Sequence, residues 1–273
     1  MSWADKVIAN PMGYARAVLF PRARDALQQF LALGGRYVAP ICICPQVGSL
    51  LAPEGISMEE LSKVFLDVDH TGLAPGTQMY GYRIDHNEDL DLDPLLTGWW
   101  LTPPHSPHRI ISLGRHKILP LYGGGVFCTN DLSLADELAN HSPGFPGGSH
   151  YAEKVEIVFE HLTEVVHARW AQIELWDRYL GDMLDRIPRE QAMPWRCMRL
   201  AQPKARDTIV RALRKAGVGA SFNYPSLGSP EHYPGGTWWE HRVISFPLGP
   251  LGEDNEKYII KASEIISGVL ELL

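Results

Sequence analysis

Apolar residues repeat along the chain with two different periods, which predict helices mixed with short strands. Helical spacing between cap and stop residues predicts helices at residues 25–33, 58–63, 132–138, 151–184, 204–215 and 253–272. Short apolar runs predict strands at residues 36–41, 64–68, 109–112, 125–129, 196–200, 220–224 and 242–246. The alternation of strands and helices in the first part is typical of a parallel α/β layer.

The pattern changes near Pro188, after the long predicted helix. From there the predicted order is strand, helix, strand, strand, helix, which describes a small α+β unit. We therefore expect an α/β fold with two domains. Residues 1–187 form a large domain that is built around a mostly parallel sheet and includes the long helix, and residues 188–273 form a small C-terminal α+β domain. Residues 85–107 are acidic and then proline-rich, and we expect them to be extended and irregular.

Composition and charge exclude several classes of protein. Of the 273 residues, 45% are hydrophobic and 21% are charged, as in an ordinary globular protein. The net charge of −7 and the lack of a basic stripe argue against nucleic-acid binding. No apolar run approaches the ~20 residues that cross a membrane. The first residues lack the apolar core of a signal peptide, so we expect a cytoplasmic protein.

The cysteines and the acidic and histidine clusters do not predict a metal site. The cysteines lack further ligands at zinc spacing and are expected to be buried thiols: Cys42, Cys44, Cys128 and Cys197. The acidic run 89–93 places proline and tryptophan where a calcium loop needs glycine and glutamate, so we expect an exposed acidic strand. His161, Glu164 and His167 do not share one helix face, and we expect them at the surface.

The segment from Ser112 to Gly125 carries the clearest chemistry. Ser112 ends an apolar strand, Lys117 follows five residues later, and three glycines then allow the backbone to approach another group closely. A hydroxyl that binds phosphate and an amine that forms a Schiff base would together suit an aldehyde cofactor that carries a phosphate. A solvated lysine after a strand is the alternative interpretation.

The same segment resembles the DegT/DnrJ/EryC1/StrS sugar aminotransferases, which are pyridoxal-phosphate enzymes of fold type I. Ser112-Leu-Gly-Arg-His-Lys117, the three glycines and Thr129-Asn-Asp131 resemble the family's serine, Schiff-base lysine, glycine pair and Thr-Asn-Asp. Gly217-Val-Gly219 and Asn223-Tyr-Pro-Ser-Leu227 resemble its Gly-Ile/Val-Gly and His-Tyr-Pro-Pro-Leu. Ser245-Phe-Pro-Leu-Gly-Pro250 resembles its Ser-Leu-Pro-Leu-His-Pro. The resemblance spans most of the chain.

The resemblance implies a fold type I aminotransferase-like architecture with a reduced large domain. It also implies the transfer of an amino group to a keto sugar linked to a nucleotide, with pyridoxal phosphate as the carrier. Lys117 would hold the cofactor and shuttle the α-proton. A carboxylate would keep the pyridine nitrogen protonated, and either Asp85 or Asp89 could supply it. We favour Asp85, because it follows an apolar run at residues 79–84, whereas Asp89 follows polar residues.

The remaining expected contacts also come from the resemblance. Ser112 and Gly124 would lie at the cofactor, with the Ser112 hydroxyl on the phosphate. Arg24 belongs to the segment Arg22-Ala-Arg24, which stands where the family has its phosphate-binding Ser-Gly-Thr, so we expect Arg24 at the cofactor too. Asn223 and Tyr224 would face the substrate. Because family active sites are built across a two-fold axis, we expect a homodimer.

The chain departs from the family pattern in three places. Only 42 residues separate Asp69 from Ser112, where the family normally has two strand–helix units. The phosphate-binding segment has lost its glycine and hydroxyl. The Asn-x-Arg element that a neighbouring subunit normally contributes is not evident near residues 147–151. These departures favour an alternative in which the protein is a non-catalytic relative that serves as a binding or partner module.

Overall fold

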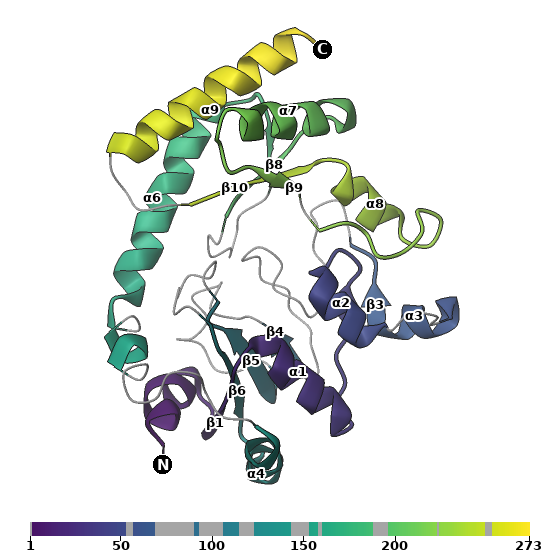
Figure 1. Ribbon diagram of the computed structural model, residues 1–273, viewed down its shortest axis with the longest axis vertical. Coiled ribbons are helices and arrows are strands. Elements are labelled where there is room, and N and C mark those ends of the chain that lie inside the picture. The colour runs from purple at the N-terminus through teal and green to yellow at the C-terminus, as the bar shows by residue number, and fades with distance from the viewer. Residues whose placement is uncertain are drawn as a thin grey trace.

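Two β-sheets lie one above the other, with helices packed around them (Figure 1). The computed structural model describes residues 2–52, 57–68, 90–92, 106–114, 123–142, 153–157, 160–187, 196–222, 224–248 and 253–273. A third, two-stranded sheet lies beside them.

The first sheet has the strand order β1-β6-β5-β4. Its strands are β1 (Arg16–Phe20), β4 (Leu90–Leu92), β5 (His108–Ser112) and β6 (Gly125–Thr129). β6 runs antiparallel to both β1 and β5, whereas β4 runs parallel to β5. It follows that β1, β5 and β4 point the same way and β6 alone opposes them, so among the described pairings two are antiparallel and one is parallel, whereas a mostly parallel sheet was predicted.

Both faces of this sheet are covered. On one face, Ile110 and Phe127 pack against α1 (Ala23–Ala32) in a cluster that also includes residues of α4 (Leu132–His141). On the other face, Ile111 and Val126 pack against two short helical segments near the N-terminus. These segments are a π-helix, η1 (Asp5–Ala9), and a 3₁₀-helix, η2 (Asn10–Met12). Burial on both faces explains why apolar residues are adjacent in both strands, as Ile110-Ile111 in β5 and Val126-Phe127-Cys128 in β6.

Local signals set the start of α4 and the end of α1, as predicted. The Asp131 carboxylate accepts a hydrogen bond from the Leu134 amide at 3.0 Å and so caps α4. Gly34 adopts a φ of 87°, the left-handed conformation that favours glycine, and ends α1.

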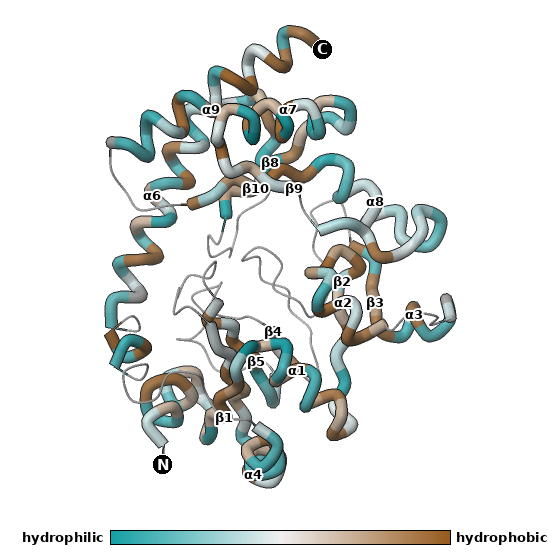
Figure 2. Tube along the Cα trace, viewed as in Figure 1, coloured by the Kyte–Doolittle hydropathy of each residue, from teal (hydrophilic) through white to brown (hydrophobic). Residues whose placement is uncertain are grey.

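The second sheet is antiparallel throughout, with the order β7-β8-β10-β9. Its strands are β7 (Asp185–Arg186), β8 (Cys197–Leu200), β9 (Ser221–Phe222) and β10 (Val243–Phe246). Three helices contribute to one core cluster with it: α6 (Leu162–Leu180), α7 (Pro203–Lys215) and α9 (Glu253–Glu271). Hydrophobic and hydrophilic residues alternate along α7 and α9, as expected of helices with one buried face (Figure 2).

A third group of elements combines residues 39–66 with residues 234–240, which are far apart in the sequence. It contains the parallel strands β2 (Ala39–Pro40) and β3 (Phe65–Leu66) and the helices α2 (Pro45–Leu51), α3 (Met58–Val64) and α8 (Pro234–Glu240). The Asp67 carboxylate accepts hydrogen bonds from the amides of Gly235 at 2.9 Å and Gly236 at 2.8 Å, at the start of α8. These bonds explain why β3 and α8 lie on the same side of the molecule in Figure 1.

Several predicted elements change in length or kind. The long helix predicted at residues 151–184 is described as α6, which starts at Leu162, together with a helical piece at residues 153–157. The strands predicted at residues 36–41 and 64–68 shorten to β2 and β3. The acidic run at residues 89–93 was expected to be an exposed strand. A strand is present, but the expected exposure is wrong for Leu90. Leu90 is 0% exposed, because β4 pairs with β5 inside the first sheet.

The boundary predicted near Pro188 lies beside residues outside the described part of the chain, and it stays a prediction. Among the described helices, none is long and apolar enough to cross a membrane.

Candidate functional site

The loop that carries Lys117 is closed at both of its ends by strand pairing. Ser112, the last residue of β5, is the register partner of Gly125, the first residue of β6. Beyond this pair, the Leu113 amide donates to the Gly124 carbonyl at 3.0 Å and the Gly123 amide donates to the Leu113 carbonyl at 3.3 Å. Residues 115–122 lie outside the described residues, but these bonds place the two ends of their loop side by side.

Glycines bring this strand pair against the start of α1. A Cβ added to Gly125 would lie 2.3 Å from the Ala23 nitrogen and 2.4 Å from the Ala23 Cα, so no larger residue fits without moving backbone. Gly124 has a φ of 110° and forms a β-bridge with Arg22. Ser112 therefore lies one strand away from the first turn of α1.

Two arginines lie at the start of α1, and they differ in their contacts. The Arg22 guanidinium binds both oxygens of Asp25, with its Nη2 atom 2.8 Å from Oδ1 and its Nε atom 3.0 Å from Oδ2. Arg24 is half-buried on the same turn and forms no ion pair with another described residue. Helix N-termini favour negative charge, so Ser112 and Arg24 flank a place that suits an anion.

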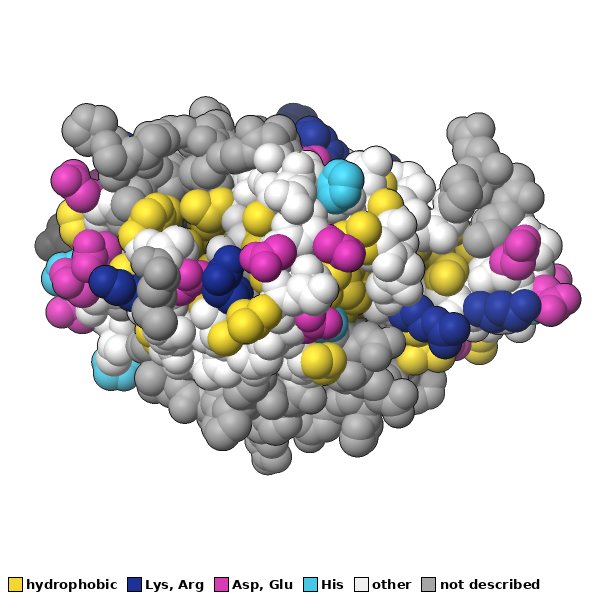
Figure 3. All heavy atoms as spheres, turned by 90° about the horizontal axis from the view of Figure 1, so that it is seen from below, with side chains coloured by type: hydrophobic (Ala, Val, Ile, Leu, Met, Phe, Trp, Pro, Cys, Tyr) yellow, Lys and Arg dark blue, Asp and Glu magenta, His cyan; other side chains and the backbone are white. Residues whose placement is uncertain are grey.

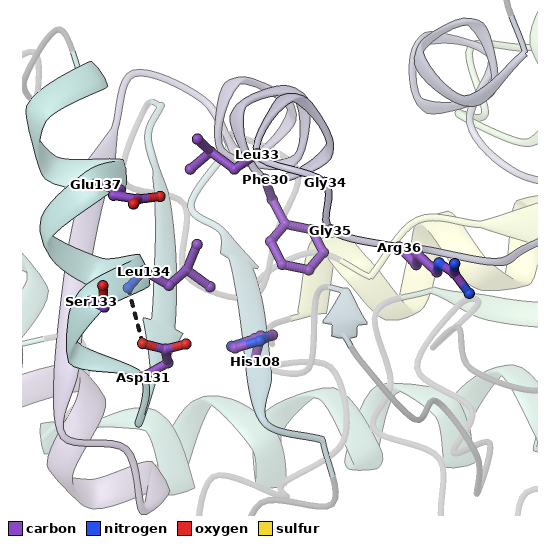
Figure 4. Close-up of a pocket in the computed structure, with 10 residues that line it drawn as sticks. All are labelled: Phe30, Leu33, Gly34, Gly35, Arg36, His108, Asp131, Ser133, Leu134 and Glu137. Atoms are coloured by element: carbon purple, nitrogen blue, oxygen red, sulfur yellow. Dashed lines mark hydrogen bonds between the residues drawn. The ribbon is translucent and has the colours of Figure 1, made fainter.

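A cavity of about 540 Å³ lies at the other end of the same elements (Figure 4). Phe30, near the C-terminal end of α1, and Arg36, four residues beyond the helix, line it together with His108, the first residue of β5. Ser112 is four residues further along β5, which at 3.3 Å per residue is about 13 Å away. In Figure 4 the Phe30 ring faces His108, and the Asp131 carboxylate caps α4 rather than reaching across the cavity. The cavity is thus separate from the Ser112 turn.

Comparison with known proteins identifies the fold. No family model matches the sequence, and no curated protein matches it. Among solved structures, the match with Spr1654 from Streptococcus pneumoniae covers 100% of this chain and 92% of the Spr1654 chain, at 13% identity and a TM-score of 0.76. PseC from Helicobacter pylori matches 98% over 90% of its own, at 12% identity and a TM-score of 0.77. A DegT/DnrJ/EryC1/StrS aminotransferase from Brucella abortus matches 97% over 88% of its own, at 17% identity and a TM-score of 0.71.

This chain has the fold of the DegT/DnrJ/EryC1/StrS sugar aminotransferases. The predicted α/β, fold type I architecture is therefore confirmed, and the family resemblance of the sequence agrees with it at the level of the fold.

Within the sugar aminotransferase fold, the structure brings together one set of the predicted residues. Ser112 pairs with Gly125, Gly124 bridges to Arg22, and Gly125 lies against Ala23, so Ser112 and Gly124 lie near the helix start that carries Arg24. Tyr224 is half-buried and packs against the cluster that includes residues of the first sheet. Four predicted residues lie outside the described part of the chain: Asp85, Asp89, Lys117 and Asn223. Their roles stay predictions.

Three of the four cysteines are buried in the structure, and burial keeps Cys42 and Cys128 protonated. Cys42, Cys128 and Cys197 are buried as predicted, and Cys44 is half-buried. Burial raises the pKa of Cys42 and of Cys128 to about 12, so neither is a thiolate at neutral pH. Among the described residues, no group of three or more possible ligands could hold a metal ion.

The outer surface is mixed in charge. The His161 ring lies 3.1 Å from the Glu164 carboxylate in an exposed pair, as the surface assignment predicted. On the face that Figure 3 shows, the described acidic and basic side chains are interspersed rather than segregated.

Sequence reasoning missed one polar cluster in the described structure. Arg196, Ser221 and Ser245 bind one another across three strands of the second sheet. The signal in the sequence was faint: an arginine at the start of a predicted strand and one serine in each of two others.

Proposed function

We propose that the protein is a pyridoxal-phosphate-dependent aminotransferase that acts on a nucleotide-linked keto sugar. The observation that carries this proposal is the contact of Gly125 with Ala23, which sets Ser112 and Arg24 beside the N-terminus of α1. The fold supports the choice of reaction, because Spr1654 was solved in PLP and PMP forms. PseC is an aminotransferase in the biosynthesis of pseudoaminic acid, which supports a sugar substrate.

The described residues fit the phosphate of this cofactor. The turn offers a helix N-terminus, a hydroxyl from Ser112 and a cation from Arg24, and all three favour a dianion. Gly124 and Gly125 add no side chain that would fill the space beside this turn. Arg24 thus supplies by charge what the family's Ser-Gly-Thr supplies by a hydroxyl and backbone amides.

The other residues complete the proposed reaction. When bound, the cofactor supplies an electron sink for the charge left at the substrate carbon that loses a proton. Lys117 holds the cofactor through its amine, and that amine then moves the proton as a general acid and base. Asp85 or Asp89 holds a proton on the pyridine nitrogen, and Asn223 and Tyr224 orient the substrate. Lys117 lies three residues after Gly114, and three residues span at most about 11 Å.

One observation favours the alternative of a non-catalytic relative. Arg22 is bound to Asp25 at the turn where the family has its phosphate-binding segment. If this ion pair only stabilises the helix start, the fold could serve as a binding or partner module without the cofactor.

The test of the proposed function is cofactor binding followed by absorption spectroscopy. Addition of pyridoxal phosphate to the purified protein should give a visible absorption band that shifts when an amino donor is added. We expect Asp85→Ala to weaken cofactor binding and slow the spectral shift, since the loss of its charge removes the group that keeps the pyridine nitrogen protonated. We expect Asp89→Ala to leave both unchanged.

Melting temperature is the control, because the loss of one carboxylate whose proposed partner is the cofactor should change the stability of the fold little. The absence of any band at saturating cofactor would overturn the proposed function. A band that neither variant alters would mean that no carboxylate in this segment binds the pyridine nitrogen, and would favour the non-catalytic alternative.

We also propose that the protein works as a homodimer. Closed two-fold symmetry is the commonest form of homo-oligomer, and it would let each subunit complete the other's pocket. Sedimentation velocity at micromolar concentration should therefore show a dimer. A stable monomer would contradict this prediction.

We place the protein in the cytoplasm. The described free cysteines suit a reducing compartment, in which thiols persist.

A further inference from the structure

Strand β1 forms one edge of the first sheet, since among the described strands it pairs with β6 alone. In an antiparallel pair, successive residues of a strand turn their N–H and C=O groups alternately toward the partner and away from it. The Ala17 amide donates to Asp5 Oδ1 at 2.8 Å, and the Leu19 carbonyl accepts from Ser142 Oγ at 2.5 Å. Ala17 and Leu19 are therefore the residues of β1 that turn away from β6.

Two backbone groups of this edge have no partner within the described part of the chain. Asp5 and Ser142 bind the Ala17 N–H and the Leu19 C=O, and between these two bonds lie the Ala17 C=O and the Leu19 N–H. No described residue bonds to either of these inner groups. An edge strand that presents such groups can pair with another segment of backbone.

A cavity of about 400 Å³ lies along these two groups. Residues 17–19 of β1 line it, together with Asp5 and Ser142, the two side chains that bind the edge. Its other walls include apolar residues from the start of the chain and from α4: Trp3, Ala4 and Ala139. Figure 1 shows the N-terminal helical segment and α4 beside β1. The volume is within the range of ligand pockets, about 300–1,000 Å³.

The two inner groups fit one residue of an extended peptide that runs parallel to β1. In a parallel pair, a residue donates its N–H to the carbonyl before the residue opposite it and accepts at its C=O from the N–H after that residue. Here the residue opposite is Val18. An antiparallel peptide would make the two bonds from two residues and place the carbonyl of one beside the Asp5 carboxylate. Because a carboxylate only accepts hydrogen bonds, the antiparallel orientation is disfavoured.

The same two side chains limit the length of the bound segment. In a longer parallel strand, the Ala17 N–H and the Leu19 C=O would bond to residues two places before and two places after the central one. Asp5 and Ser142 already bind these groups, and Asp5 is fixed because it also accepts from the Ser2 amide at 2.6 Å. The peptide therefore turns away from β1 after one residue on each side.

We propose that the edge of β1 binds an extended three-residue segment of a partner protein, with a β-branched apolar residue at its centre. Main-chain hydrogen bonds supply the affinity in this mode of strand addition, and the cavity supplies the specificity. The central side chain shares the face of Val18, which packs with residues of α4, and so it lies toward Ala139. Two copies of β1 that paired across a two-fold axis would run antiparallel, which Asp5 disfavours.

The test is fluorescence anisotropy of the full chain with a dye-labelled peptide, acetyl-Ala-Ala-Val-Ala-Ala. We expect saturable binding. The same peptide with an N-methylated valine lacks the hydrogen that bonds to the Ala17 carbonyl, and should bind about fivefold more weakly or worse. N-methylation of the first alanine is the matched control, because that residue lies beyond the contact with β1. It should leave the affinity unchanged.

A pair of variants on α4 tests the place of binding. Ala139→Trp puts a large side chain into the cavity and should weaken binding of the valine peptide by about tenfold or more. Asn140→Trp adds the same side chain at the next exposed position of the helix, outside the cavity lining, and should leave binding unchanged. Both positions are exposed, so both variants should fold, and melting temperature checks this.

Three results would overturn the proposal: no saturable binding of the valine peptide up to millimolar concentration, equal affinity of the valine and N-methylvaline peptides, or equal weakening by the two tryptophan variants. Sedimentation velocity tests a second copy as the occupant. If Ala139→Trp but not Asn140→Trp turned a dimer into a monomer, the edge would be a contact between copies, and the proposal would also be overturned. The peptide assay needs no cofactor, so its outcome is independent of the proposed aminotransferase function.

Discussion

Lys117→Ala should abolish covalent attachment of pyridoxal phosphate and lower the transamination rate by about a thousandfold or more. The lysine amine has two proposed tasks, to hold the cofactor and to move the proton of the substrate, and an alanine does neither. Proton transfer requires a proton-carrying group within hydrogen-bond reach of the reacting carbon, and an alanine side chain has none. Fold stability should stay close to that of the wild type.

Borohydride reduction with added cofactor, followed by peptide mapping, measures this directly. The wild type should carry the label on Lys117, and Lys117→Ala should carry none. Lys63→Ala is the matched control, because Lys63 is an exposed lysine on α3 that only pairs with Glu59 at 3.1 Å. Its labelling should equal that of the wild type. A label on a lysine other than Lys117 would disprove the assignment.

The elements that could be predicted from sequence are those whose signals are local. β5 and β6 each contain adjacent apolar residues, Ile110-Ile111 and Val126-Phe127-Cys128, which is typical of a strand that is buried on both faces. α4 follows a capping aspartate at Asp131, and α1 stops at Gly34. In each case the residues that define the element lie within it or next to it.

The elements that could not be predicted depend on distant parts of the chain. α8 contains Gly235 and Gly236, which disfavour a helix, and it forms where Asp67 accepts their amide hydrogens from 168 and 169 residues away. The strand β4 was predicted, but its pairing with β5, which buries Leu90, depends on residues about 18 positions later. Local propensity carries no information about such partners.

The residues of the candidate site fall into the same two groups: some have a local sequence signal, and others are brought together only by the fold. Ser112 and Lys117 were found through one contiguous motif. The cluster of Arg196, Ser221 and Ser245 comes from three distant parts of the chain, and the pairing of β8 and β9 with β10 brings its members together. The close contact of Gly125 with Ala23 could not be predicted from the sequence either, because it joins the start of α1 to a strand about a hundred residues later.

Gly125→Val should damage both the fold and cofactor binding. A Cβ at this position would lie 2.3 Å from the Ala23 nitrogen and 2.5 Å from the Arg22 carbonyl carbon, so backbone must move rather than a flexible side chain. Moving β6 away from α1 opens a buried contact and should cost about 2–4 kcal/mol of unfolding free energy. The same shift separates Ser112 from the first turn of α1, so affinity for pyridoxal phosphate should fall by about tenfold or more.

Urea denaturation measures the first effect, and absorption titration with pyridoxal phosphate in the absence of urea measures the second. Gly268→Ala is the control, because nothing lies within 4 Å of a Cβ at that position in α9. There an alanine should be neutral or stabilise by up to about 1 kcal/mol, since it restricts the unfolded chain. If Gly125→Val bound the cofactor as the wild type does, Ser112 and the start of α1 could not be the phosphate site. The cofactor would then have to bind elsewhere, because the close contact of β6 with α1 is the one feature that holds these groups together.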